Sequence, residues 1–171
     1  MTSNYLVILT VFLLIACSTQ ESRSPDQLYV KGRKNLSTQQ GIVDIKKCAE
    51  LGHGGCAQIL GTLYLAGSGV EQDFNKAMKW QLAAWETGID YGYAGALGAL
   101  HAATYYCELS YFDVSPKKAE ILIDSAFKIL ETLTSSYSKE RMQVEHANVE
   151  EILEEITHIR NKVRNGECTR A

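Results

Sequence analysis

Glu155-Ile-Thr-His158 has a residue spacing that could support metal chemistry. A Glu-x-x-His pair on a helix presents a carboxylate and an imidazole on one face, as in di-iron carboxylate bundles. Such a centre also requires a second pair and two further carboxylates on facing helices. We therefore expect Glu155 and His158 to lie on a solvated helix surface.

Cysteines are the other candidates for chemistry. Apart from Cys17 there are four, Cys48, Cys56, Cys107 and Cys168, and they allow three pairings in an oxidising compartment. His53 lies between Cys48 and Cys56, which raises a metal site as an alternative, but no recognised set of ligands with the right spacing is complete. Since all four cysteines can pair, we expect no catalytic thiol and no metal.

Other nucleophile and cofactor patterns are missing from the sequence. Gly67-Ser68-Gly69 is not followed by the Gly-Lys-Ser/Thr of a phosphate-binding loop. His101 and His146 stand alone, and no Ser-His-Asp arrangement can be argued from spacing. Seventeen basic residues are scattered among 20 acidic ones, so no basic stripe suits nucleic acid. We predict a protein that is not an enzyme, has no cofactor and does not bind nucleic acid.

The first residues are typical of an export signal. The run 5–16 (YLVILTVFLLIA) is uncharged and too short to span a bilayer, although its leader has no Lys or Arg. The segment Leu14-Ile15-Ala16-Cys17 resembles the lipobox of bacterial lipoproteins. That resemblance implies a signal peptide over residues 1–16 and lipidation of Cys17. Ser18 after the cysteine is similar to the sorting pattern for the outer membrane of Gram-negative bacteria.

Residues 17–27 are polar and are predicted to form a tether. The chain after them is long enough for one domain and too short for two. We assign that domain to residues 28–171.

Residues 56–88 predict a helical hairpin. Ile59, Leu60, Leu63 and Tyr64 recur at helical spacing on the first helix. Glycines at 67 and 69 suit a tight reversal, and Asp73 is placed to cap a second helix that Gly88 ends. Gly61 lies within the first helix, where its use would be to let a neighbouring helix approach closely.

This hairpin resembles a Sel-one-like repeat, a relative of the tetratricopeptide repeat. The matching residues are Leu60-Gly61, Tyr64, Gly67-Ser68-Gly69-Val70, Asp73, Lys76-Ala77, Trp80, Ala83-Ala84, Glu86 and Gly88. The resemblance implies an all-α fold, a short α/α solenoid of helical hairpins. It also implies, from the cysteine-rich branch of the family, a Cys48–Cys56 bridge, which leaves Cys107 to pair with Cys168.

The flanks match the repeat more weakly. Residues 44–52 align with 80–88, and Leu97-Gly98 aligns with Leu60-Gly61, which opens a degenerate repeat over 93–133. In this repeat an aromatic segment replaces the glycine turn, and we predict an irregular loop over 105–112, with the second helix restarting at Ser115-Pro116. Residues 138–163 are predicted to form a long C-terminal capping helix.

Solenoids of this kind bind peptides or protein surfaces on the concave face of their first helices. Aromatic residues are typical of such interfaces, and our candidates for partner binding are Tyr64, Tyr91, Tyr93, Tyr105, Tyr106, Tyr111 and Phe112.

The resemblance implies an adaptor or inhibitor that binds a partner protein in the periplasm, anchored to the membrane by lipid. Small exported members resemble immunity proteins that neutralise secreted antibacterial effectors such as phospholipases. The alternatives are a protein that binds or hydrolyses β-lactams or peptidoglycan, as suggested by the cysteine-rich branch, and a structural lipoprotein that braces another assembly.

Overall fold

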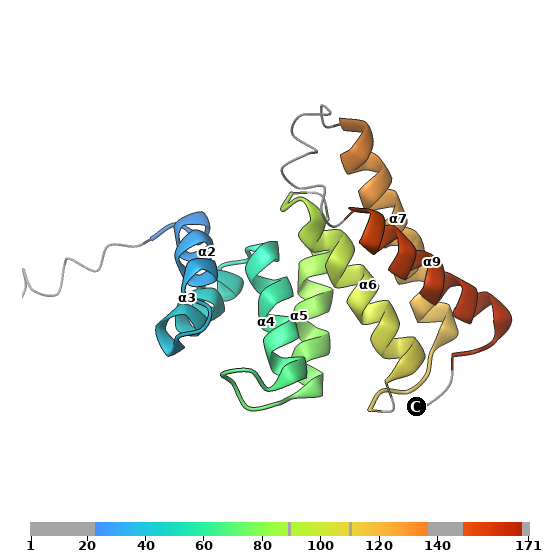
Figure 1. Cartoon of the computed structure of the whole chain (residues 1–171), viewed down its shortest axis with the longest axis horizontal. Coiled ribbons are helices and arrows are strands. Elements are labelled where there is room, and N and C mark those ends of the chain that lie inside the picture. Colours follow the sequence, from blue (N-terminus) through green and yellow to red (C-terminus); the bar gives the residue numbers. More distant parts are fainter. Residues whose placement is uncertain (1–22, 89, 110, 137–148, 169–171) are drawn as a thin grey trace, which may run out of the picture.

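The computed structural model describes residues 23–88, 90–109, 111–136 and 149–168, and within these ranges the chain is entirely helical (Figure 1). Its elements are the seven helices α2 (Pro25–Lys34), α3 (Gln39–Glu50), α4 (Gly54–Ala66), α5 (Phe74–Glu86), α6 (Tyr93–Glu108), α7 (Pro116–Ser136) and α9 (Val149–Asn165). The all-α prediction is confirmed. The signal peptide and Cys17 lie outside the described residues.

The helices pack as sequential pairs, the arrangement from which a short superhelix is built. Helix α2 packs against α3, α4 against α5 and α6 against α7, while α9 packs against both α6 and α7. Figure 1 shows this progression from α2 and α3 at one end to α7 and α9 at the other. The first helices of successive pairs also contact one another: α6 packs against α4 and also against α9. We call the surface formed by α4, α6 and α9 the first-helix face.

Two glycines allow close helix packing on either side of α5. A Cβ atom added at Gly61 of α4 would lie 2.7 Å from Nε2 of Gln81. One added at Gly98 of α6 would lie 2.7 Å from the backbone nitrogen of Trp85. Both contacts are shorter than a carbon atom tolerates, so a larger residue would push these helices apart. The close approach predicted at Gly61 is confirmed, and Gly98 repeats it.

Side-chain caps explain where several helices begin. Asp73 caps α5 by accepting a hydrogen bond from the backbone N–H of Lys76 at 2.9 Å, as predicted. Ser24 and Gln27 form a capping box at the start of α2, which places Pro25 in the first helical turn. Helix α2 therefore begins within the range that we expected for the tether.

Helix α6 corrects the prediction of an irregular loop over 105–112. The helix continues to Glu108, so Tyr105 and Tyr106 are helical, and only a short connection precedes Pro116. The small buried residues Ala96, Ala99 and Ala103 continue the helical periodicity up to Cys107, and no glycine or proline follows Gly98 within this helix. The predicted restart at Pro116 is confirmed.

The C-terminal helix agrees with the prediction over the part that can be compared. Residues 149–163 lie in α9, which runs on to Asn165, whereas residues 138–148 lie outside the described residues. Its buried face carries Ile152, Ile156 and Ile159, and these join a continuous core that starts at Leu28 of α2. No helix in the described part of the chain is long and apolar enough to cross a membrane.

Candidate functional site

Two disulfides mark the two ends of the helical array. Cys48–Cys56 joins the last turn of α3 to the first turn of α4, over a separation of 8 residues. Cys107–Cys168 joins the last turn of α6 to the segment after α9, over a separation of 61 residues. This pairing is the one implied by the family resemblance. Because such bridges persist only where thiols are not kept reduced, they indicate an oxidising, extracytoplasmic location.

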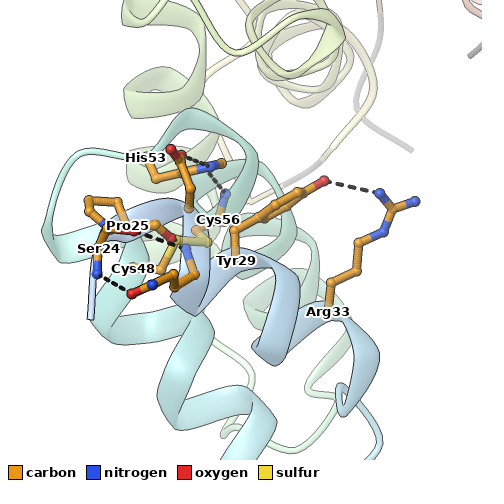
Figure 2. The surroundings of a disulfide bond; sticks show 9 residues. Ser24, Pro25, Tyr29, Arg33, Cys48, His53 and Cys56 are labelled. Carbon is orange, nitrogen blue, oxygen red and sulfur yellow. Dashed lines mark hydrogen bonds and ion pairs between the residues drawn. A yellow bond between two sulfur atoms is a disulfide. The ribbon is translucent and has the colours of Figure 1, made fainter. Parts of the chain in front are cut away.

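His53 fills the joint between α3 and α4, beside the first disulfide (Figure 2). Its Nδ1 accepts a hydrogen bond from the backbone N–H of Cys56 at 3.3 Å and so caps α4. The imidazole is 5 % exposed and lies between the rings of Tyr29 and Tyr91, with centroid distances of 4.6 and 4.1 Å. This cap could not be predicted from the sequence, because histidine is not a usual N-cap residue.

The protonation state of His53 follows from these contacts. Burial lowers the pKa of the imidazole, and the negative charge of Asp26 partly opposes that effect. Since Nδ1 accepts a hydrogen bond, the proton of the neutral ring lies on Nε2, which is 3.4 Å from Oδ1 of Asp26. His53 is therefore a neutral, buried side chain with a carboxylate at its outer nitrogen.

The first-helix face contains a cavity of about 360 Å³ between α4, α6 and α9. Its apolar wall includes Leu65, Tyr105 and Ile159, and polar side chains from all three helices stand around it. We call it the α4–α6–α9 cavity. Its lining residues are Thr62, Leu65, His101, Thr104, Tyr105, Glu108, Glu155, His158 and Ile159.

Charges are arranged unevenly around this cavity. Oε1 of Glu108 accepts a hydrogen bond from Nζ of Lys162 at 2.6 Å and lies 3.8 Å from Nε2 of His158. The carboxylate of Glu155 makes no ion pair or side-chain hydrogen bond with any described residue. Burial lowers the pKa of His101, so this imidazole is neutral near pH 7, and burial raises the pKa of Tyr105. The cavity thus carries an excess of negative charge.

Glu155 and His158 are both exposed on α9, as the prediction of a solvated helix surface requires. The His158 side chain is 64 % exposed, but both residues line the cavity and face His101 and Glu108 of α6. The sequence could not reveal this constellation, because the two pairs are about fifty residues apart. These four side chains do not converge on one point. Among the described residues, the group that brings three metal-ligating atoms within 4.8 Å of one another is Cys48, His53 and Cys56.

The aromatic candidates for partner binding do not share one face. Tyr64 and Tyr105 are buried in the core, and of the seven candidates only Tyr105 lines the cavity. Tyr91 packs on His53 and does not line the cavity. The remaining candidates are partly buried, as Tyr93, Tyr106 and Phe112 are, or exposed, as Tyr111 is.

Tyr111 is the most exposed of these aromatic residues, with 66 % of its surface accessible. Its ring stacks on Phe74 at a centroid distance of 3.7 Å, which joins the connection after α6 to the start of α5. Phe112 stacks on Tyr105 at 5.9 Å. These ring contacts therefore hold the connection after α6 against α5 and α6, and Tyr111 also offers exposed apolar surface.

No protein-family profile matches the chain, and neither a curated protein nor a solved structure matches it. What is shown is an all-helical domain whose helices pack in sequential pairs and which carries two disulfides.

Proposed function

We propose that this chain is a Sel-one-like repeat protein that binds a partner protein through its first-helix face and has no catalytic activity. The α4–α6–α9 cavity is the observation that carries this proposal. It lies where the first helices of successive pairs meet, and in helical-hairpin solenoids that face receives ligands. Its volume of about 360 Å³ lies at the lower end of the range for ligand sites and can admit a side chain of a partner.

The chemistry of the cavity favours a basic anchor from the partner. Leu65, Tyr105 and Ile159 offer apolar walls for the methylene stem of a lysine or arginine. Glu155 provides a carboxylate that no described side chain engages. A buried Arg or Lys paired with it would contribute the type of centrally placed contact that dominates protein interfaces.

The setting of the interaction follows from the cystines and the N-terminal sequence. The two disulfides agree with export, and the run 5–16 followed by Cys17 resembles a lipoprotein signal. We propose an anchor at Cys17 that holds the domain at the envelope of a Gram-negative bacterium, facing the periplasm. Confinement near the membrane raises the effective concentration toward partners that work there. A secreted antibacterial effector, neutralised by this protein as its immunity factor, is such a partner.

A β-lactam hydrolase is a weaker proposal for this cavity. Its hydroxyl-bearing lining residues are Thr62, Thr104 and Tyr105, and no serine lines it among the described residues. Oγ1 of Thr104 donates to the carbonyl oxygen of Leu100 at 3.0 Å, which leaves it poorly placed as a nucleophile.

Capture of partners from envelope fractions by the purified protein tests the interaction. We expect Glu155→Lys to weaken capture of the partner about tenfold or more, because a like charge would face the basic anchor. Glu150→Lys is the matched control, since Glu150 lies on the same helix, is exposed and does not line the cavity. Equal capture by both variants would exclude the cavity as the binding site.

A further inference from the structure

Cys48, His53 and Cys56 form a compact, buried group at the joint between α3 and α4. Both cysteines are 0 % exposed and His53 is 5 % exposed. One ligand atom from each of the three residues lies within 4.8 Å of the other two. In the described state the two sulfurs are bonded to each other, as Figure 2 shows.

Two thiolates and an imidazole are the ligands that Zn²⁺ prefers. Tetrahedral coordination at about 2.3 Å for Zn–S and about 2.0 Å for Zn–N separates neighbouring ligand atoms by roughly 3.3–3.8 Å. The three atoms lie within 4.8 Å of one another, although the two sulfurs are bonded at 2.01 Å in the oxidised state. Reduction would require only that the sulfurs move apart, without any large movement of the helices that carry them.

We propose that, when Cys48 and Cys56 are reduced, they bind one thiophilic divalent cation together with His53, with Zn²⁺ as the reference ion. The disulfide and the metal are then mutually exclusive states of one site. Reduction of the bridge adds two electrons and two protons and yields two thiols. Binding of the cation releases those two protons as the thiols become thiolates, and water occupies the fourth coordination position.

The surroundings of His53 are those of a supported metal ligand. Coordination through Nδ1 would exchange the hydrogen bond from Cys56 for a bond to the metal and would leave the proton on Nε2. That nitrogen already faces Oδ1 of Asp26 at 3.4 Å, which gives the carboxylate–histidine–metal arrangement that orients such ligands. The rings of Tyr29 and Tyr91 hold the imidazole on both sides.

The Cys48 sulfur also has a partner that suits the reduced state. It lies 3.3 Å from the carbonyl oxygen of Pro25, to which a thiol could donate a hydrogen bond before the metal arrives. The reduced pair would therefore remain seated in the same joint. This inference does not depend on the proposed binding of a partner at the α4–α6–α9 cavity.

The second cystine provides a matched comparison. Cys107 and Cys168 belong to no group of three ligand atoms in the described part of the chain. We compare a Cys107→Ser/Cys168→Ser chain, which keeps the proposed site, with a Cys48→Ser/Cys56→Ser chain, which keeps the other pair. Cys17→Ser is included in every chain so that this thiol does not contribute.

Each chain is reduced with a phosphine, which takes an oxygen atom from water and becomes the phosphine oxide. The reduced chain is then titrated with Co²⁺ as a spectroscopic substitute for Zn²⁺. We expect the chain that keeps Cys48 and Cys56 to bind one equivalent, with thiolate-to-cobalt charge-transfer absorbance that Zn²⁺ abolishes. The added substitution His53→Ala should weaken binding at least tenfold, and Asp26→Asn about 10- to 100-fold. Equal affinity of the two double variants, or no effect of His53→Ala, would overturn the proposal.

Thermal unfolding keeps the test decisive if the double variant folds poorly after reduction. In the reduced chain that retains Cys48, Cys56, Cys107 and Cys168, Zn²⁺ should raise the unfolding midpoint, because a ligand that binds the folded state stabilises it. The same chain with His53→Ala should show no such rise. A rise of equal size in both chains would show that the metal binds elsewhere and would contradict the proposed site.

Discussion

The two disulfide-bridged joints of this molecule are built in opposite ways. At the α3–α4 joint, a bridge between residues 8 apart lies beside His53, and aromatic rings fill the remaining space. At the α6–α9 joint, a bridge between residues 61 apart closes a large loop, and the helices beside it enclose a cavity of about 360 Å³. We therefore call the α3–α4 joint the filled joint and the α6–α9 joint the hollow joint.

The difference indicates what each bridge contributes. The α3–α4 joint is also held by its cap and ring contacts, and its bridge closes a short loop, so this bridge constrains the chain less than the other one. At the α6–α9 joint, the polar side chains of Glu108, Glu155 and His158 line a cavity between the helices. A covalent link there holds α9 in place without filling the cavity, which leaves the space free for a partner.

Removal of the bridges should expose this contrast most strongly. In the chain-entropy model, loss of the 61-residue loop through Cys107→Ser/Cys168→Ser costs about 4 kcal/mol, whereas Cys48→Ser/Cys56→Ser costs about 2.5 kcal/mol. Urea unfolding of the two double variants measures both losses in free energy of unfolding.

Each double variant replaces two buried sulfurs by hydroxyls, so the chemical change is matched between them. Equal losses would show that α9 docks through its side-chain contacts alone. A larger loss at Cys48 and Cys56 would reverse our account of the two joints.

The α4–α5 hairpin and the hollow joint differ in how far the sequence could predict them. Gly61, Gly67 and Asp73 have local roles, namely close packing, a left-handed turn with a φ of 66° at Gly67, and a cap. Such roles are readable because they depend on neighbours in the chain. The hairpin over 56–88 was predicted correctly for that reason.

The cavity could not be predicted, because its residues come from three helices that are distant in the sequence. Nothing about His101 indicates that Glu155 will stand opposite it. The predicted loop over 105–112 was wrong for a related reason. We assigned the aromatic residues there to an exposed loop, whereas Tyr105 points into the core and the contacts of α6 with α5 and α7 keep the segment helical.

Added volume provides a second way to compare the joints. A Cβ atom at Gly55 would lie 3.0 Å from Cε2 of Tyr29 and 3.1 Å from Cε1 of His53. Because those rings are stacked together and Tyr91 packs on the other side of His53, they cannot easily move away. We expect Gly55→Ala to cost about 1 kcal/mol, as overpacking outweighs the gain in helix propensity.

Thr104→Leu is the counterpart in the hollow joint. Thr104 lines the α4–α6–α9 cavity, so the larger side chain can enter empty space, and we expect a change in free energy of unfolding within about 0.5 kcal/mol. The same variant should weaken capture of a partner, because the space for the anchor is smaller. A neutral Gly55→Ala together with a costly Thr104→Leu would contradict the assignment of the filled and hollow joints.

The smallest expected effect is a pH dependence that comes from the hollow joint. Burial lowers the pKa of His101 below its ordinary value of 6.5. The unfolded chain therefore takes up this proton more readily than the folded protein as the pH falls below about 6.5. The free energy of unfolding should decrease from pH 7 toward pH 5, and the contribution of His101 should be complete above pH 6.5.

The groups that face His101 determine how this prediction is tested. They are Glu108 on its own helix and Glu155 and His158 on α9, while α4 presents only uncharged residues to the cavity. His101→Gln should reduce the slope of stability against pH, as measured by urea unfolding at several pH values. It should not remove the slope completely, because burial also lowers the pKa of His53.

His158→Gln is the control for the loss of a cavity histidine, since its side chain is 64 % exposed and solvent reaches it in the folded state. If His101→Gln and His158→Gln changed the slope equally, the buried position of His101 would not be the cause. If neither changed it, the filled joint at His53 would account for the acid sensitivity, and the two joints would differ in their response to protons as they do in their packing.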